Sequence, residues 1–241
     1  DRAAYRLRDQ YDQDVLGYLC GFEQSAKHVN ADTARTTSPG TKAIASAGSN
    51  ELLTSMVLKK GDFDAITTSS AGDHSIPLAI RLPGITTVPT ATVTPFQVVA
   101  RMGRLLDQQF VDTTDRWLVV DSVFIELLKD EDSRLLNSDF GGSGLQNGLV
   151  MNNLHGFKVY VSNNLPKVGG GPATSGSGNQ NTDFGVIVAG HGSAVATAQQ
   201  VSKTESYRDP DSFADIVRGM HLYGRKILRP EGLVTAKYNV A

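Results

Sequence analysis

The sequence has 241 residues and a formal net charge of −2, so it offers no electrostatic argument for binding nucleic acid or an anionic membrane. Its one cysteine, Cys20, excludes an internal disulfide framework and fits a reducing compartment. Hydrophobic residues make up 40% of the chain and no apolar run is long enough to span a bilayer, which indicates an ordinary globular protein.

The chain opens with a predicted amphipathic helix over residues 2–24. Its apolar residues recur at spacings of three and four and form one stripe: Ala4, Leu7, Tyr11, Val15, Tyr18, Leu19 and Phe22. Cys20 lies within this pattern, so we interpret it as a buried thiol in preference to a nucleophile. Because Asp1 falls inside the same charged helical pattern, we expect the chain to begin part-way through a longer protein.

Residues 29–50 lose the helical pattern and predict a boundary or a long surface connection. A weaker period predicts a second helix over 51–60. Prolines then exclude a long helix between 62 and 94, where we predict short extended runs.

A further helix is predicted to start at Thr94. Threonine suits the N-cap, Pro95 suits the first turn, and Gln97 completes a capping box. The predicted buried face of this helix consists of Val98, Val99, Met102, Leu105, Leu106 and Phe110.

The stretch 116–166 predicts a compact unit of strand, helix, glycine-bearing turn and strand. The run 117–120 suits a buried strand, and Asp121 and Ser122 are good N-caps for a helix that continues to Lys129. The segment 156–162 has the aromatic and β-branched content of a second strand. Nothing in this unit resembles a reaction centre.

The last third of the chain predicts mostly strands. Residues 167–183 are rich in glycine and predict a loop or flap, and 184–189 predict a strand. We then predict a short helix over 194–200, an extended run over 201–207 and one or two helical turns ending near Val217. The final prediction is a hairpin-like pair of strands, 220–228 with 233–238.

The best candidate for catalysis is the pair His191 and Ser193, because a serine near backbone donors could use them to stabilise an oxyanion. No Gly-x-Ser-x-Gly elbow surrounds it, so we interpret Ser193 as the cap of the helix that follows. The five histidines show no metal-ligand spacing, and no cofactor fingerprint is present, so we predict no catalytic, cofactor or metal site. The basic group Arg225, Lys226 and Arg229 is either a solvated strand face or a contact with another subunit or nucleic acid.

An ordered series of residues resembles the major capsid proteins of tailed phages, which share the fold first seen in bacteriophage HK97. In the middle of the chain the series comprises Arg116–Asp121, Phe124, Leu127, Leu128, Gly148 and His155–Pro166. In the tail it comprises Ala194, Ala198, Gln199, Glu205, Arg208–Pro210, Phe213, Gly219, Tyr223, Gly224 and Arg229–Val234. The resemblance covers residues 94–241 well and the opening helix loosely, whereas 31–93 match nothing in the family. Ser122 stands where the family often has proline.

The resemblance implies an α+β, HK97-like capsid fold with an axial domain, a peripheral domain and a long spine helix. Residues 1–35 would form the spine helix of the peripheral domain, 36–200 the axial domain, and 201–241 the returning peripheral-domain sheet. The family's N-terminal arm and extended loop would lie before Asp1.

The resemblance also implies a structural, non-enzymatic function. The subunit would assemble with itself, as hexamers and pentamers, into an icosahedral shell around double-stranded DNA, with scaffolding, portal and decoration proteins as further partners. It would be located in the virion capsid after assembly in the host bacterial cytoplasm, without membrane contact. Two alternatives remain at this point: an encapsulin-like compartment, and a serine hydrolase that uses Ser193 and His191.

Overall fold

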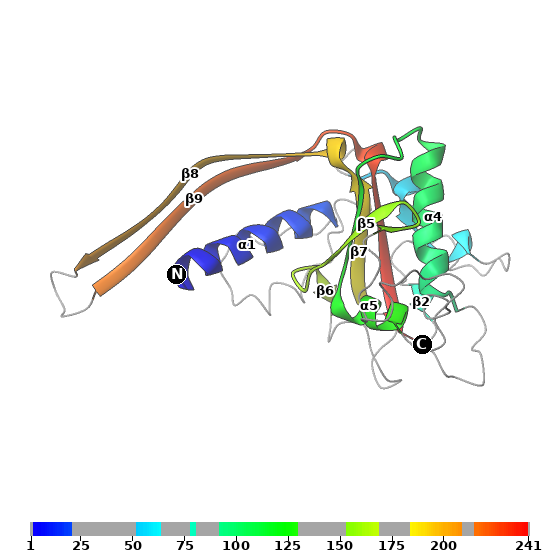
Figure 1. The fold of residues 1–241 in the computed structure, drawn as a ribbon, viewed down its shortest axis with the longest axis horizontal. Coiled ribbons are helices and arrows are strands. Elements are labelled where there is room, and N and C mark those ends of the chain that lie inside the picture. The colour runs from blue at the N-terminus through cyan, green and yellow to red at the C-terminus, as the bar shows by residue number, and fades with distance from the viewer. Residues whose placement is uncertain are drawn as a thin grey trace.

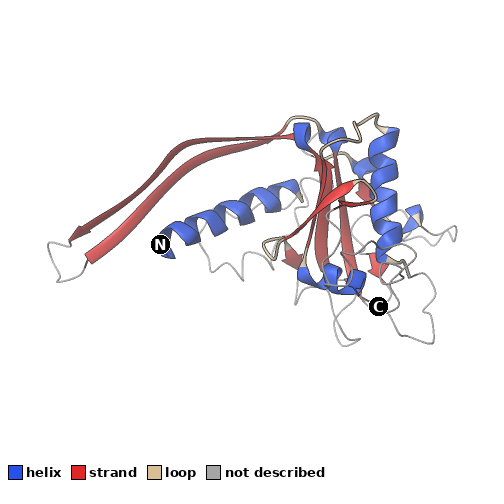
Figure 2. Ribbon diagram, in the orientation of Figure 1, coloured by secondary structure: helices blue, strands red, loops and turns tan. Residues whose placement is uncertain are grey.

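The computed structural model describes residues 2–20, 52–63, 78–80, 92–129, 153–168, 184–208 and 215–240. These residues form a body built on one large mixed sheet, and a long two-stranded arm that leaves the body on one side (Figures 1 and 2). Within the described residues the large sheet has the strand order β1-β10-β7-β3-β5-β4, with β2 beside β10 and β6 beside β7. The arm pairs β8 with β9.

The helices are α1 (Arg2–Leu19), α4 (Pro95–Gln108) and α5 (Ser122–Lys129). The strands of the large sheet are β1 (Val57–Leu58), β2 (Leu78–Ile80), β3 (Arg116–Val120), β4 (Asn153–Leu154), β5 (Phe157–Val161), β6 (Lys167–Val168), β7 (Phe184–His191) and β10 (Leu233–Val240). The strands of the arm are β8 (Val195–Arg208) and β9 (Asp215–Ile227). Short 3-10 turns include η5 (Gly192–Ala194) and η6 (Pro230–Gly232).

Helix α4 begins as its capping signal predicts. The Thr94 hydroxyl accepts a hydrogen bond from the Gln97 N–H at 3.3 Å, and the Gln97 side chain accepts one from the Thr94 N–H at 3.0 Å. These two bonds satisfy backbone donors that a helix start otherwise leaves without partners. The predicted capping box is confirmed.

The predicted strand–helix–strand unit is also confirmed in its described part. Strands β3 and β5 lie side by side and parallel, with Trp117 opposite Lys158, and α5 makes the crossover between them. Asp121 caps α5, because its Oδ1 accepts a hydrogen bond from the Phe124 N–H at 3.0 Å. The predicted turn at 139–144 lies outside the described residues.

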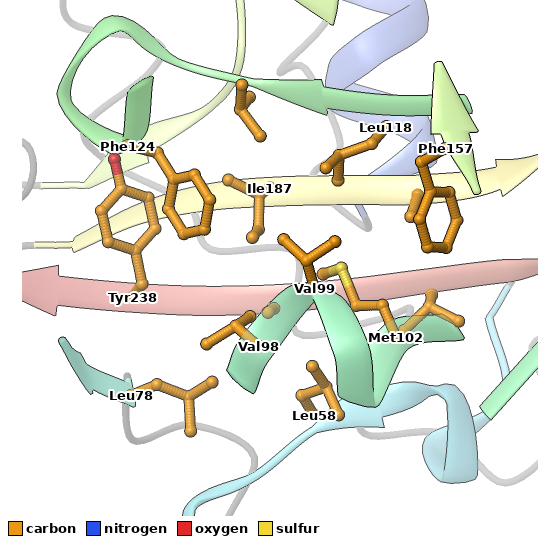
Figure 3. Packing of buried hydrophobic residues seen from close by; sticks show 14 of the residues in the cluster. Leu58, Leu78, Val98, Val99, Met102, Leu118, Phe124, Phe157, Ile187 and Tyr238 are labelled. Atoms are coloured by element: carbon orange, nitrogen blue, oxygen red, sulfur yellow. The ribbon is translucent and has the colours of Figure 1, made fainter. Parts of the chain in front are cut away.

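The large sheet is covered on both faces, and β7 runs through its centre between β10 and β3. On one face α4 and α5 pack over side chains from the central strands, as Figure 3 shows. The largest buried members of this cluster include Leu118, Met102, Phe124, Phe157 and Tyr238. The Tyr238 hydroxyl donates a hydrogen bond to Asp121, and burial is the main reason that its pKa is raised. This bond links β10 to the start of α5.

The opposite face of the sheet receives the C-terminal end of α1. Leu19 and Cys20 belong to the same buried cluster as Val186 and Val188 of β7 and Leu233 of β10. The Cys20 thiol is 1% exposed and its burial raises its pKa, so the prediction of a buried thiol is confirmed. Helix α1 confirms the predicted opening helix as far as Leu19, and residues 21–24 lie outside the described part.

Three predictions of local structure are wrong. The segment 51–60 was expected to be a helix, but Val57 and Leu58 form β1 and pair in parallel with β10. The segment 194–200 was also expected to be a helix, but from Val195 onward it belongs to β8. The residues just before Val217 were expected to be helical, whereas Asp215 already opens β9. In each segment strand pairing replaces a weak local helical period: β1 pairs with the distant β10, whereas β8 and β9 pair with each other.

The predicted pairing of 220–228 with 233–238 is wrong as well. Strand β9 pairs with β8, and β10 enters the large sheet antiparallel to β7, with Leu233 opposite Gly190. Among the described residues, β9 and β10 therefore belong to two different sheets. The predicted loop 167–183 begins with a short strand, β6, which pairs Lys167 with Gly185, and residues 169–183 lie outside the described part.

Candidate functional site

His191 and Ser193 lie in contact at the end of β7, but their arrangement is that of a turn. The Ser193 backbone N–H donates to His191 Nδ1 at 3.1 Å, and the Ser193 hydroxyl lies 2.8 Å from the same nitrogen. His191 therefore caps η5, and the prediction that Ser193 would be the cap is wrong. Among the described residues no carboxylate bonds the ring of His191, so the third group that would orient a catalytic base is not supplied there.

The loop between α4 and β3, residues 109–115, is held by hydrogen bonds from the buried side chain of Arg116. The Arg116 guanidinium is 5% exposed, and it donates to the backbone carbonyls of Val111 at 2.6 Å and Asp112 at 2.7 Å. It also forms an ion pair with Asp107 at 2.7 Å. One buried cation thus fixes the end of α4 and the first half of the loop.

Acidic side chains surround this loop. Asp112 accepts a backbone hydrogen bond from Thr114, and this bond is the main reason that the pKa of its carboxyl lies below its usual value. Asp115 forms an exposed ion pair with Lys158 of β5 at 3.1 Å. The loop is therefore polar and slightly acidic at its rim.

The second candidate surface is the arm. Its strands pair in register from Val195 with Ile227 out to Arg208 with Asp215, with one irregularity between Gln199 and Val201. At about 3.3 Å per residue, the 14 residues of β8 extend about 46 Å. The 18 residues of α1 extend only about 27 Å at 1.5 Å per residue. The described turns of α1 therefore cover only part of one side of the arm, as Figure 1 shows.

The arm and α1 are joined by a cluster of polar and aromatic side chains. Asp14 of α1 accepts a hydrogen bond from the Tyr223 hydroxyl at 2.8 Å and forms an ion pair with Arg225. The Arg225 guanidinium also donates to the Asp14 carbonyl at 2.6 Å and lies 4.8 Å from the centre of the Tyr18 ring. The ring of Tyr11 meets that of Tyr223 edge-on at 4.7 Å. These contacts fix the direction in which the arm leaves the body.

The environment of Tyr223 disfavours its ionised form. Desolvation raises the pKa of Tyr223 to about 12, and the hydrogen bond to Asp14 adds to the increase. Because the pKa of Tyr223 is higher in the folded state, the contact contributes its full share to the free energy of unfolding below about pH 10, which is the pKa of an unperturbed tyrosine. The contribution is lost as the pH rises toward 12.

The side of β9 that points away from α1 carries exposed apolar side chains. Side chains alternate along a strand, so Tyr223 and Arg225 on the α1 side place the even-numbered residues on the other. We call this surface the outer face of β9; it comprises Arg218, Met220, Leu222 and Lys226. Met220 is 58% exposed and Leu222 is 52% exposed. This surface was not predicted from the sequence, because a strand was expected to begin only at Met220 and to pair with residues 233–238.

The predicted basic group does not form one patch. Arg225 faces α1 and is bonded to Asp14, whereas Lys226 is exposed on the outer face of β9. Arg229 lies beyond the strand and pairs with Glu231 at 3.4 Å. The three side chains therefore serve different contacts.

The ion pair between Arg225 and Asp14 gives a test of how the arm is attached. Replacing Arg225 with methionine should lower the free energy of unfolding by about 2 kcal/mol, because a partly buried carboxylate loses its charged partner. Arg218→Met is a matched control on the same strand, since the Arg218–Glu205 pair is exposed and should contribute less than about 0.5 kcal/mol. Chemical denaturation of both variants checks this expectation. Equal effects would show that Arg225 does not hold the arm to α1.

Within the described ranges no group of histidine, cysteine or acidic side chains is arranged to hold a metal ion. None of the described helices is both long and apolar enough to cross a membrane.

Comparison with known proteins shows a clear relationship. A family model described as phage capsid protein matches residues 2–236. A chain from Mycobacterium phage Che8 is similar at 29% identity with a TM-score of 0.50, over 67% of this chain and 54% of that one. A chain from the capsid of the cyanophage P-SCSP1u has 20% identity and a TM-score of 0.45, over 68% of this chain and 53% of that one.

A third similar chain comes from the asymmetric unit of the mature capsid of bacteriophage PhiM1. It has 16% identity and a TM-score of 0.47, over 68% of this chain and 51% of that one. The chain thus spans about half the length of the solved chains that it matches. Among curated proteins, none matches it significantly.

Proposed function

The chain belongs to the phage capsid protein family, and we propose that it is the major capsid subunit, which assembles as hexamers and pentamers into an icosahedral shell around double-stranded DNA. The family and the α+β fold of HK97 type, both expected from the sequence, are confirmed. The finer statements about ring size, shell symmetry and contents are part of the proposal.

The observation that carries the proposal is the arm. A two-stranded ribbon with one face only partly covered is marginally stable by itself, and exposed apolar side chains on such a ribbon normally mark a contact with another molecule. The outer face of β9 presents Met220 and Leu222 in this way. An arm that projects from a compact body supplies contact surface without requiring a cleft, which suits a protein that functions by association.

The division of the chain into domains follows the two parts of the fold in our proposal. The large sheet would form the axial domain, including β10 at the end of the chain, and α1 with the arm would form the peripheral domain, with α1 as the spine. This arrangement keeps the predicted role of residues 1–35. It moves residues 233–240 out of the predicted peripheral segment 201–241, because they pair with β7.

Scaffolding, portal and decoration proteins belong to the same proposal, as does assembly in the host bacterial cytoplasm. The geometry of His191 and Ser193 gives no support to the hydrolase alternative, since the histidine nitrogen nearest the serine already accepts a backbone hydrogen bond. The encapsulin-like compartment differs from a capsid in what it encloses, so the contents of the particle decide between them.

Electron microscopy of the purified full-length protein tests this function. We expect closed shells, and nuclease-protected double-stranded DNA inside those recovered from infected cells. Ser193→Ala should leave the yield of shells unchanged. Shells that enclose protein and no DNA would favour the compartment, and a protein that remains monomeric with esterase activity abolished in Ser193→Ala would overturn the proposal.

A further inference from the structure

Phe110 is an unusual residue at the C-terminal end of α4. The helix closes with a Schellman motif, in which the Val111 N–H bonds the Leu106 carbonyl at 3.1 Å and the Phe110 N–H bonds the Asp107 carbonyl at 3.0 Å. The motif requires a left-handed backbone at Phe110, whose φ is 55°. Glycine normally occupies this position, because a side chain with a β-carbon is strained there.

The side chain of Phe110 is also unfavourable, because it exposes an aromatic ring to solvent. It is 93% exposed, although the sequence pattern predicted that it would belong to the buried face of α4. That prediction is wrong because the helix ends at Gln108, so Phe110 no longer follows the helical period. The neighbouring Val111 is 8% exposed and packs in the core. The turn at the end of α4 is therefore held by the buried Val111, whereas the ring of Phe110 is exposed to solvent.

A residue that is strained in its backbone and exposed in its aromatic side chain contributes little to the folded subunit. An observed backbone outlier of this kind points to a function outside the fold of the single chain. Aromatic residues are common anchors of protein interfaces, where a few buried side chains carry most of the binding energy. Arg116 bonds the carbonyls of Val111 and Asp112, so the backbone next to Phe110 is held in place before any partner binds.

The charges around Phe110 indicate which partner it meets. Asp107, Asp112 and Asp115 surround the loop and are opposed by two cations, Arg116 and Lys158, so the rim carries excess negative charge. This charge disfavours packaged DNA as the partner. The outer face of β9 has the complementary character: its described side chains include exposed apolar residues and two cations, Arg218 and Lys226, of which Arg218 pairs with Glu205 of β8.

Helix α4 packs on one face of the large sheet, whereas α1, which contacts the arm, packs on the other, and the arm leaves the body on the side away from α4 (Figure 1). We propose that Phe110 is the anchor of a head-to-tail contact in which it packs on the outer face of β9 of a second copy of this chain. A contact between two different surfaces of the same chain is heterologous, and it generates rings when its rotation closes. This inference rests on the proposed shell function and adds the residues that join neighbouring subunits.

Replacing Phe110 with glycine separates the folding of the subunit from its assembly. Phe110→Gly should raise the Tm of the unassembled subunit by about 3 °C, because glycine relieves the left-handed strain. The same variant should need at least about tenfold more protein for half-maximal assembly, as expected for the loss of an interface anchor. His155→Gly is the matched control, since His155 is also exposed and has a φ of 50°. It should assemble as the wild type does.

Cross-linking tests the identity of the second surface. Full-length protein that carries both Phe110→Cys and Leu222→Cys, assembled and treated with a mild oxidant, should give a ladder of disulfide-linked multimers. Either single replacement should give no ladder, because Cys20 is buried. Normal assembly of Phe110→Gly, or the lack of a ladder from assembled double-cysteine particles, would overturn the proposed contact. A wild-type protein that forms no closed particles would instead contradict the proposed function.

Discussion

Replacing Gly190 with alanine is expected to lower the free energy of unfolding by about 3 kcal/mol. Gly190 lies in the central strand β7, opposite Leu233 on one side and Trp117 on the other. A β-carbon there would lie 2.7 Å from Leu233 Cδ2 and 2.9 Å from both the Gly232 carbonyl oxygen and Trp117 Cζ2. One of these three atoms belongs to the backbone and another to a packed ring, so the strands themselves would have to move.

Thermal or chemical denaturation of the subunit measures this effect, and Gly224→Ala is its control. Gly224 also lies inside a strand, but a β-carbon at that position would have no atom within 4 Å. Gly224→Ala should leave the free energy of unfolding unchanged or raise it by a few tenths of a kcal/mol, because alanine lowers the conformational entropy of the unfolded chain. If both alanine variants had the same stability, the close packing of β3, β7 and β10 described above would be wrong.

Replacing Arg116 with methionine is expected to cost about 3 kcal/mol. Methionine fills a similar volume but leaves the carbonyls of Val111 and Asp112 without their donor and removes the partner of Asp107. Because Arg116 holds the first half of the 109–115 loop, the same change should also speed hydrogen exchange at the loop amides.

Denaturation and hydrogen exchange of Arg116→Met should be compared with those of Arg104→Met. Arg104 lies on the exposed side of α4, so its replacement should change stability by less than about 0.5 kcal/mol. A loop that keeps its protection in Arg116→Met would show that other contacts fix it. The preorganisation assigned to Phe110 would then need a different source.

The parts of the fold that the sequence could predict are those with local signals. The capping box at Thr94 determines where α4 begins, and the run from Arg116 to Lys129 contains a buried strand, an N-cap and a helix in sequence. Strand β7 is buried on both faces, which is why a nearly continuous apolar run identified it. In these segments propensity and tertiary packing agree.

The pairing of the last strands could not be predicted, because alternation within a strand does not identify its partner. Strand β10 follows β9 after only a few residues, which is a typical hairpin spacing, yet it turns away at η6 and pairs with β7. Strand β9 pairs with β8, whose first residues had a composition compatible with a helix. The β7–β10 contact is distant in sequence and has no local signal, whereas β8 and β9 are consecutive strands whose pairing was missed because helical turns were predicted in both segments.

The proposed contact surfaces could be predicted only in part. Phe110 fits the apolar period of α4, and no glycine marks the point where the helix stops, so the sequence assigned it to the core. His191 and Ser193 were considered together as a catalytic candidate, but the capping of η5 by His191 depends on backbone geometry that the sequence did not reveal. The family resemblance, in contrast, depended on an ordered series of residues and did not require these details.

We propose that this chain functions through contacts between copies, made by the arm and by the loop that carries Phe110. A cryo-EM map of the assembled particle, at a resolution that shows side chains, tests it most directly. The predicted result is a closed shell in which the outer face of β9 and Phe110 are both covered by neighbouring subunits. A map in which the arm projects into solvent and Phe110 contacts no other subunit would overturn both proposed contacts.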